Sequence, residues 1–247
     1  MMTDKVEQID LAKLAEQAGR YPDMLASMKK IAESNSDLTI EERNLLSIAY
    51  KNVIGNCRAS WRIISNIEYE AQNTEHQQEI VKTYRKKIEN ELQAICHELL
   101  SLLDKHLILN ATTTESEVFF LKMKGDYYRY LAEISTGNER QSKFATESKD
   151  AYTTAFDIAQ NQMVATDPIR LGLALNFSIF YYEIANEPDI SYRLTKQAFD
   201  DALLELDGLS DDAYRESSAI MQLLRNNFKL WTNNEYDSNG TNQQEEQ

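Results

Sequence analysis

The sequence predicts an all-α fold of nine antiparallel helices in one domain that spans residues 1–232. Only 3 Pro and 7 Gly occur among 247 residues, which leaves few positions for turns between β-strands. Apolar residues recur at helical spacing almost throughout the chain. The segments between these patterns are short, and short connections favour antiparallel packing of neighbouring helices. No pattern recurs at a fixed period, which counts against a regular tetratricopeptide-type solenoid.

Residues typical of helix starts and ends set the expected boundaries. The nine helices are expected at residues 4–18, 22–34, 40–71, 75–108, 114–135, 141–162, 168–186, 189–206 and 211–232. Three pairs have the form of a capping box, namely Thr39 with Glu42, Thr74 with Gln77, and Thr114 with Glu117. Proline is suited to the first turn of a helix, and the candidates are Pro22, Pro168 and Pro188. Gly137 and Gly208 are suited to C-terminal caps.

Two further features of the helical pattern concern glycine and the chain end. Gly55, Gly125 and Gly172 fall inside predicted helices, where each costs about 1 kcal/mol relative to alanine. Close approach of a neighbouring helix is the favoured explanation, and exposure of backbone beside a ligand stays open. Residues 233–247 show no apolar periodicity, so we expect a disordered acidic C-terminal tail there.

The charge balance restricts the partners that the protein can have. With 26 Lys+Arg against 40 Asp+Glu, the formal net charge is −14, and such a surface repels nucleic acid and anionic lipid. The N-terminus has no signal-peptide pattern, and the longest apolar stretch, 171–184, is too short to span a bilayer. We therefore expect a cytoplasmic protein without nucleic-acid binding or membrane insertion, and a nuclear location is left open.

The sequence offers little for catalysis or metal binding. Cys57 and Cys96 cannot form a disulfide framework, and no CxxC pair occurs. The segment from His97 to Ser101 fails the zinc-protease motif, because Ser101 stands where the second histidine belongs. A GxxxxGKS/T loop and a GxSxG elbow are also missing. We expect no enzymatic activity, no cofactor and no metal ion.

Three cations form a stripe on the third predicted helix. Lys51, Arg58 and Arg62 follow i, i+7, i+11 spacing, so the two arginines lie about 20° to either side of the lysine. Like charges on one face repel each other, and no carboxylate in this segment relieves the repulsion. A multiply charged anion would neutralise the stripe. A solvated basic face is the alternative.

Three more predicted helices carry polar lines that match this stripe. Lys122 and Arg129 are seven residues apart, and Tyr130 follows, so that a guanidinium and a phenol can donate to one oxyanion. Two further lines combine amides with aliphatic side chains, namely Gly172, Asn176, Ile179 and Glu183 on one helix and Ile220, Leu223, Asn227 and Trp231 on another. An amide can bracket an extended peptide backbone. Ordinary core packing is the alternative.

Four segments, 43–52, 124–133, 168–178 and 220–225, resemble signature sequences of the 14-3-3 family. They read RNLLSIAYKN, KGDYYRYLAE, PIRLGLALNFS and IMQLLR, and the likeness extends over nearly all of 11–231. The resemblance implies an all-helical, cup-shaped dimer whose amphipathic grooves bind phosphoserine or phosphothreonine segments of client proteins. Such an adaptor modulates the activity, location or assembly of its clients in signal transduction.

The resemblance also implies roles for individual residues. The phosphate-binding set would be Lys51, Arg58, Arg129 and Tyr130. The peptide groove would be formed by Arg62, Lys122, Leu175, Asn176, Ile179, Glu183, Ile220, Leu223, Asn227 and Trp231. Three departures from the family pattern are Ala219 in place of a larger aliphatic residue, Cys57 in place of an arginine, and the turn containing Gly19 and Pro22.

The family's dimer surface carries over in the same way. It would consist of Leu14, Ala18, Arg20, Asp23, Ser60, Ile64, Ile67, Tyr84, Lys87 and Glu91. The crossed pairs Arg20–Glu91 and Asp23–Lys87 are complementary, so we expect a homodimer, with a heterodimer with a paralogue left open. The competing function is a phosphorylation-independent helical-repeat scaffold, which needs amphipathic helices but no convergent cations.

Overall fold

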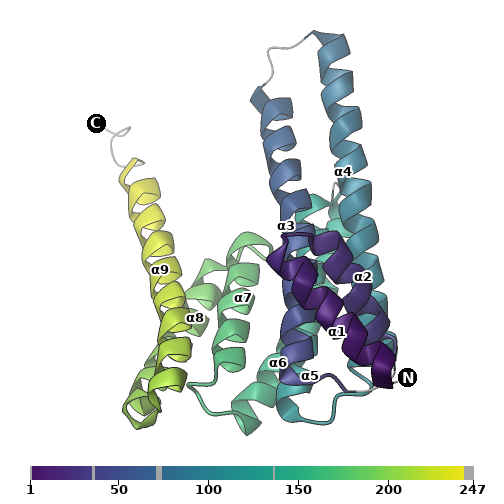
Figure 1. Cartoon of the computed structure of the whole chain (residues 1–247). Helices are drawn as coiled ribbons and strands as arrows, with labels where there is room; N and C mark the ends of the chain where they lie inside the picture. Colours follow the sequence, from purple (N-terminus) through teal and green to yellow (C-terminus); the bar gives the residue numbers. More distant parts are fainter. Residues whose placement is uncertain (1, 35–36, 71–73, 136, 242–247) are drawn as a thin grey trace. The chain divides into compact units, whose positions relative to one another are not determined.

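A computed structural model describes residues 2–34, 37–70, 74–135 and 137–241, and every regular element in these ranges is helical (Figure 1). The predicted all-α class is therefore confirmed, with nine α-helices, one π-helical turn and one 3₁₀ turn in the described part of the chain. The helices group into two compact units. Among the described helices, none is long and apolar enough to cross a membrane.

The first unit contains the N-terminal helices α1 (Met2–Gln17), α2 (Tyr21–Ala32), α3 (Ile40–Glu70) and α4 (Glu75–Leu102), followed by the π turn η1 (Leu103–Leu107). Figure 1 shows α3 and α4 as a long pair lying side by side, with α1 and α2 packed against each other. The core of this unit is apolar and includes the fully buried Met24, Met28, Leu46, Leu92 and Leu99. Burial of these stripes, rather than helix propensity, provides most of the stability of such helices.

The second unit contains α5 (Thr114–Ile134), α6 (Asn138–Gln162), α7 (Pro168–Glu183), α8 (Pro188–Glu205), the 3₁₀ turn η2 (Leu206–Gly208) and α9 (Asp211–Thr241). Helix α7 contacts α6, α8 and α9, and it is correspondingly apolar on several sides. Its N-terminus is capped by Asp167, whose carboxylate accepts from the backbone N–H of Ile169 at 2.7 Å. This cap and Pro168 begin the helix at the predicted residue.

Two of the three predicted capping boxes are present, and the third is displaced by one residue. Thr39 and Glu42 bond each other's backbone N–H at 3.0 and 3.2 Å, and Thr74 and Gln77 form the same box. The prediction for Thr114 and Glu117 is wrong. The preceding threonine, Thr113, accepts from the N–H of Ser116 at 3.1 Å, while the Thr114 hydroxyl donates to Gln162. Thr112, Thr113 and Thr114 follow one another, so the sequence contains more than one possible N-cap residue for this helix.

The structure corrects three further boundary predictions. Gly137 precedes α6 with φ +112°, so it marks a helix start rather than a C-terminal cap. The π turn interrupts the predicted helix 75–108, because the N–H of Ile108 bonds to the carbonyl of Leu103 at 2.9 Å. Helix α9 continues nine residues beyond its predicted end at 232, into a polar segment without apolar periodicity. The remainder of the predicted tail, 242–247, lies outside the described residues.

Gly125 shows why one of the three helical glycines is needed. A Cβ at Gly125 would lie 2.6 Å from Cδ1 of Tyr152, whereas a Cβ at Gly55 would meet no atom within 4 Å. Close packing, the favoured explanation, is therefore confirmed for Gly125. At Gly172 a Cβ would lie 3.7 Å from Lys122 Cε, which is an ordinary contact.

The two glycines predict opposite effects of the same substitution. Gly125→Ala should lower the free energy of unfolding by about 1–3 kcal/mol, because Tyr152 must shift in a packed core. Gly55→Ala should raise it by up to about 1 kcal/mol, because it removes the helix penalty of glycine without a clash. Urea unfolding of both variants beside the wild type measures the difference. Equal effects of the two substitutions would contradict the packing at Gly125.

Candidate functional site

The cationic stripe lies on α3 in the first unit. Tyr50 and Ile54 are buried on the core side of this helix, and Lys51 and Arg58 lie about 100° and about 80° around the helix from Tyr50. Lys51 and Arg62 are exposed, and Arg58 is half-buried. Burial of this side fixes the rotation of α3 about its axis. The cations therefore lie at the edge of the packed surface.

A polar contact holds α3 in place beside this stripe. The hydroxyl of Tyr50 donates to Glu98 of α4 at 3.1 Å, and Lys29 of α2 donates to the other oxygen of that carboxylate at 2.8 Å. Burial of the Tyr50 hydroxyl, together with the neighbouring carboxylate of Glu98, raises its pKa far above the ordinary value. The phenol thus stays neutral and joins three helices of the unit through one carboxylate.

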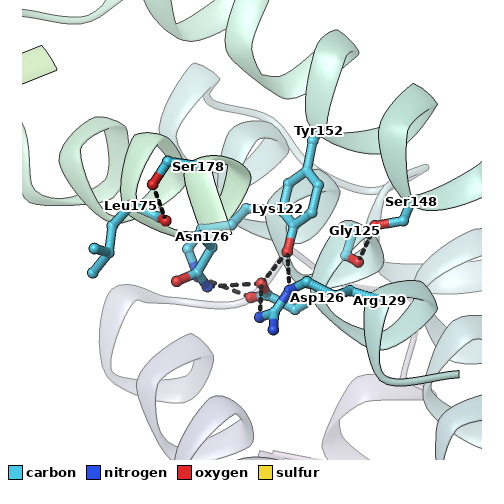
Figure 2. Close-up of polar contacts among 9 residues, drawn as sticks. All are labelled: Lys122, Gly125, Asp126, Arg129, Ser148, Tyr152, Leu175, Asn176 and Ser178. Carbon is cyan, nitrogen blue, oxygen red and sulfur yellow. Dashed lines mark hydrogen bonds and ion pairs between the residues drawn. The ribbon is translucent and has the colours of Figure 1, made fainter. Parts of the chain in front are cut away.

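In the second unit, polar side chains from three helices converge on one carboxylate, that of Asp126 (Figure 2). Lys122 Nζ lies 3.0 Å from its Oδ2, and Arg129 Nη2 lies 3.3 Å from its Oδ1. The same Oδ1 accepts from the Tyr152 hydroxyl of α6 and, at 2.7 Å, from the Asn176 amide of α7. We call these five residues the Asp126 cluster. It joins α5, α6 and α7.

The charges of the Asp126 cluster do not cancel. Burial alone would raise the pKa of Asp126, but Lys122 and Arg129 outweigh it and hold that pKa below the usual range. Burial opposes the charge on Arg129, yet the neighbouring Tyr152, Tyr130 and Asp126 raise its pKa well above the ordinary value. Two cations and one carboxylate leave one net positive charge. This local excess of positive charge stands in a chain whose formal charge is −14.

The guanidinium of Arg129 is held in one orientation. The residue is 6% exposed, Nε donates to the Tyr152 hydroxyl at 3.2 Å, and Cζ lies 4.8 Å from the centre of the Tyr130 ring. The Tyr152 ring is itself fixed, since it packs against Gly125 and stacks on Phe177 with a centroid distance of 5.2 Å. A pre-positioned guanidinium loses little conformational entropy when it binds an oxyanion.

Sequence reasoning missed two members of this cluster. Asp126 is four residues after Lys122 and three before Arg129, and pairs at these spacings face each other on a helix. That spacing could have identified Asp126 as their partner from the sequence. Tyr152 lies on a different helix with no local pattern that points to Asp126, so only the tertiary packing reveals it. Asn176, a member of the predicted polar line on α7, donates a hydrogen bond to Asp126.

The polar and aliphatic line on α7 runs from the cluster toward the helix end. Leu175, Asn176 and Ile179 are half-buried, and Glu183 is exposed. The hydroxyl of Ser178 donates to the Leu175 carbonyl at 2.7 Å, which satisfies that hydroxyl within the helix. The aliphatic side chains in this line, Leu175 and Ile179, therefore flank the Asn176 amide.

The corresponding line on α9 is less uniform. Ile220 and Asn227 are half-buried and Leu223 is 51% exposed, whereas Trp231 is only 5% exposed. The Trp231 indole stacks on Tyr182 with ring centroids 4.7 Å apart, so most of its surface packs inside the unit. The neighbouring Ala219 is exposed, and it adds little apolar surface.

Most residues of the predicted dimer surface are exposed in the first unit. They are Leu14, Ala18, Arg20, Asp23, Ser60, Ile67, Tyr84, Lys87 and Glu91, with Ile64 half-buried. Within the chain, Arg20 forms an ion pair with Asp23. Large exposed side chains such as Leu14, at 62%, and Tyr84, at 52%, are costly in water and are typical of a surface that another protein covers.

Cys57, which departs from the family pattern, contacts one residue of this surface. Its Sγ lies 3.7 Å from Glu91 Oε1. Burial, and then the adjacent carboxylate, raise the pKa of the Cys57 thiol to about 11. The thiol is therefore protonated at neutral pH.

The Asp126 cluster predicts a specific loss of stability. Asp126→Asn leaves the buried guanidinium of Arg129 without its carboxylate, which should cost about 3–5 kcal/mol in urea unfolding at pH 7. The folded-state pKa of Asp126 is lowered, so its stabilisation is present above the unfolded pKa and is lost as pH falls through the folded pKa. The gap between wild type and variant should therefore begin to shrink near the unfolded value of about pH 4 and close only below the lower, folded-state pKa.

The matched control is Asp212→Asn, since Asp212 is exposed and lies 3.6 Å from an exposed Arg215. Its effect should stay within about 0.5 kcal/mol at both pH values. A gap between wild type and Asp126→Asn that is independent of pH would refute the charge-based account.

Comparison with known proteins identifies the family. The family model described as "14-3-3 protein" matches residues 11–232. The chain is 58% identical to 14-3-3 protein zeta of Bombyx mori over 232 residues, which cover 94% of each chain. It is 65% identical to 14-3-3 protein homolog 2 of Schistosoma mansoni over 199 residues, covering 81% of this chain and 92% of the relative. It is 55% identical to 14-3-3 protein beta/alpha of Mus musculus over 240 residues, covering 97% of both. The chain therefore belongs to the 14-3-3 family, as its signature segments predicted.

Proposed function

We propose that Lys51, Arg58, Arg129 and Tyr130 bind the phosphate of phosphoserine or phosphothreonine in client proteins. Members of the 14-3-3 family are phosphopeptide-binding adaptors and not enzymes, and this chain shares that role. Family membership also removes the support for a phosphorylation-independent scaffold. The observation that carries the residue assignment is the buried, oriented guanidinium of Arg129 in a cluster with net positive charge.

Arg129 has donors left for a ligand. A guanidinium carries five N–H groups, of which Nε bonds Tyr152 and Nη2 bonds Asp126. Phosphate oxygens match the fork of donors that remains. The Tyr130 hydroxyl, next along the helix, can donate to the same phosphate, because its ring lies against the guanidinium.

Lys51 and Arg58 supply the further positive charge in this proposal. A phosphorylated side chain carries about −1.5 to −2 charges at neutral pH, more than the single excess charge of the Asp126 cluster balances. The α3 stripe places Lys51 and Arg58 on one side of that helix. In this proposal, Lys51 and Arg58 balance the part of the phosphate charge that the Asp126 cluster leaves unbalanced.

The peptide on either side of the phosphate would be held by the polar and aliphatic lines of α7 and α9. Asn176 donates its amide N–H to Asp126, which fixes the amide plane and leaves its carbonyl oxygen to accept from a peptide N–H. Apolar peptide side chains would lie on the aliphatic members. The groove set comprises Arg62, Lys122, Leu175, Asn176, Ile179, Glu183, Ile220, Leu223, Asn227 and Trp231.

Phosphate dependence is the direct test. Fluorescence anisotropy with a labelled Arg-Ser-x-phosphoSer-x-Pro peptide should show tight binding, and its unphosphorylated twin should bind at least about 100-fold more weakly, since it lacks the charge-assisted hydrogen bonds. Arg58→Ala should cost about 2–5 kcal/mol of affinity, and Lys51→Glu should cost more, because repulsion replaces attraction.

Arg215→Ala is the control for this test, because Arg215 is exposed on α9 and outside the proposed site. It should bind the phosphopeptide as the wild type does. Unchanged affinity in Arg58→Ala, with a helical circular dichroism spectrum like that of the wild type, would defeat the phosphate-site assignment.

We also propose that the chain forms a homodimer, or a heterodimer with a paralogue, through the first unit. Exposed apolar side chains and opposite charges on α1–α2 and α3–α4 support this interface. A hollow of about 360 Å³ on α4, lined in part by Tyr84 and Lys87, adds concave surface there. We place the protein in the cytoplasm, where members of this family act, with the nucleus as a further location.

Charge reversal tests the dimer. Arg20→Glu combined with Lys87→Glu should repel the partner's Glu91 and Asp23, so analytical ultracentrifugation should find monomers at low micromolar concentration. Lys143→Glu combined with Arg215→Glu makes the same change of charge outside the first unit and should leave the dimer intact. A wild-type dimer in the first variant would locate the interface elsewhere.

A further inference from the structure

A second concave surface lies between α8 and α9, within the second unit. It is a cavity of about 300 Å³, and its lining includes Thr195, Phe199, Leu224, Arg225, Phe228 and Lys229. We call it the α8–α9 pocket. None of these residues belongs to the proposed phosphate site, peptide groove or dimer surface. The volume is at the lower end of the range for pockets that bind small molecules.

The apolar part of this pocket is rigid. Leu224 is fully buried in the core cluster that α7, α8 and α9 share, and Phe199 packs against the same cluster. The Phe228 ring contacts Tyr192 edge to face, with ring centroids 6.1 Å apart. Two aromatic rings and a leucine therefore form preformed walls, which suit a flat apolar body.

The rim of the pocket is cationic. Arg225 and Lys229 are four residues apart on α9, both exposed, and in the described ranges neither forms an ion pair with a carboxylate. Lys196, on the α8 side, pairs with Asp200 and so adds no net charge. Two uncompensated cations at adjacent turns repel each other, in a protein that is otherwise acidic. An anionic group placed between them would be attracted to both.

A buried hydroxyl in the lining is without a partner. Thr195 is 1% exposed, and its Oγ1 has no hydrogen bond to any residue that the structure describes. Threonine inside a helix commonly donates to the carbonyl four residues earlier, and an unsatisfied buried hydroxyl is destabilising. A polar atom of a bound molecule would satisfy it.

We propose that the α8–α9 pocket binds a small amphipathic molecule that has a flat aromatic body and one anionic group, a carboxylate or sulfonate. The aromatic body lies between Phe199 and Phe228 over Leu224, and the anion lies between Arg225 and Lys229. Thr195 bonds a polar atom of the ligand. This site shares no residue with the proposed phosphopeptide groove.

The test uses 8-anilinonaphthalene-1-sulfonate (ANS), whose fluorescence rises in apolar sites, with the full chain and a saturating phosphopeptide present. The neutral probe N-phenyl-1-naphthylamine has the same aromatic body without the sulfonate. Arg225→Glu combined with Lys229→Glu should weaken ANS binding at least about 10-fold, whereas the neutral probe should change by less than about 3-fold. Thr195→Val, which keeps the shape and removes the hydroxyl, should weaken ANS by about 2–5-fold.

The control is Lys143→Glu combined with Arg215→Glu, which makes the same change of charge on exposed positions of α6 and α9 outside the pocket lining. ANS binding to this control should stay within about 2-fold of the wild type. Three results would overturn the proposal: no ANS binding in the presence of saturating phosphopeptide, equal weakening in both charge-reversed variants, or unchanged ANS affinity in Arg225→Glu/Lys229→Glu.

Discussion

The buried carboxylate of Asp126 is the constraint on which the second unit depends. One oxygen accepts from Tyr152 of α6 and Asn176 of α7, while Lys122 and Arg129 of its own helix supply the compensating charge. A buried carboxylate without these partners would be far too costly, and a buried guanidinium without the carboxylate equally so. Three helices must therefore approach in one register for all five groups to be satisfied.

This interaction links packing to recognition. Tyr152 reaches the carboxylate only because α5 has a glycine at position 125, where its ring lies against the backbone. The same ring's hydroxyl accepts from Arg129 Nε, so the orientation of the guanidinium depends on a contact between two helices. In the proposed function, phosphate meets a donor that the fold has already oriented and charged, and little reorganisation remains for binding.

The helices and the charged stripes were predictable from the sequence because they depend on local spacing. Helical periodicity, prolines at helix starts and two capping boxes set most boundaries within a few residues. The third box failed because successive threonines compete for one cap, and the role of Gly137, the π turn and the end of α9 were also not predicted. The polar line on α7 that contains Asn176 was also predictable from spacing. The partner of Asn176 was not predictable, because Asp126 lies fifty residues away in the chain and Tyr152 comes from a third helix. The position of Trp231 also required the structure, since its stacking on Tyr182 joins two helices.

The environment of Cys57 has a practical consequence for chemical labelling of the protein. With a thiol pKa of about 11, only about one molecule in ten thousand carries a thiolate at pH 7, and the thiolate is the species that reacts with maleimides and oxidants. Cys96 is fully buried, and its burial likewise raises its pKa. Both native cysteines are therefore slow to react. A fluorophore can be attached through a cysteine introduced on an exposed helix face while the native thiols are left in place.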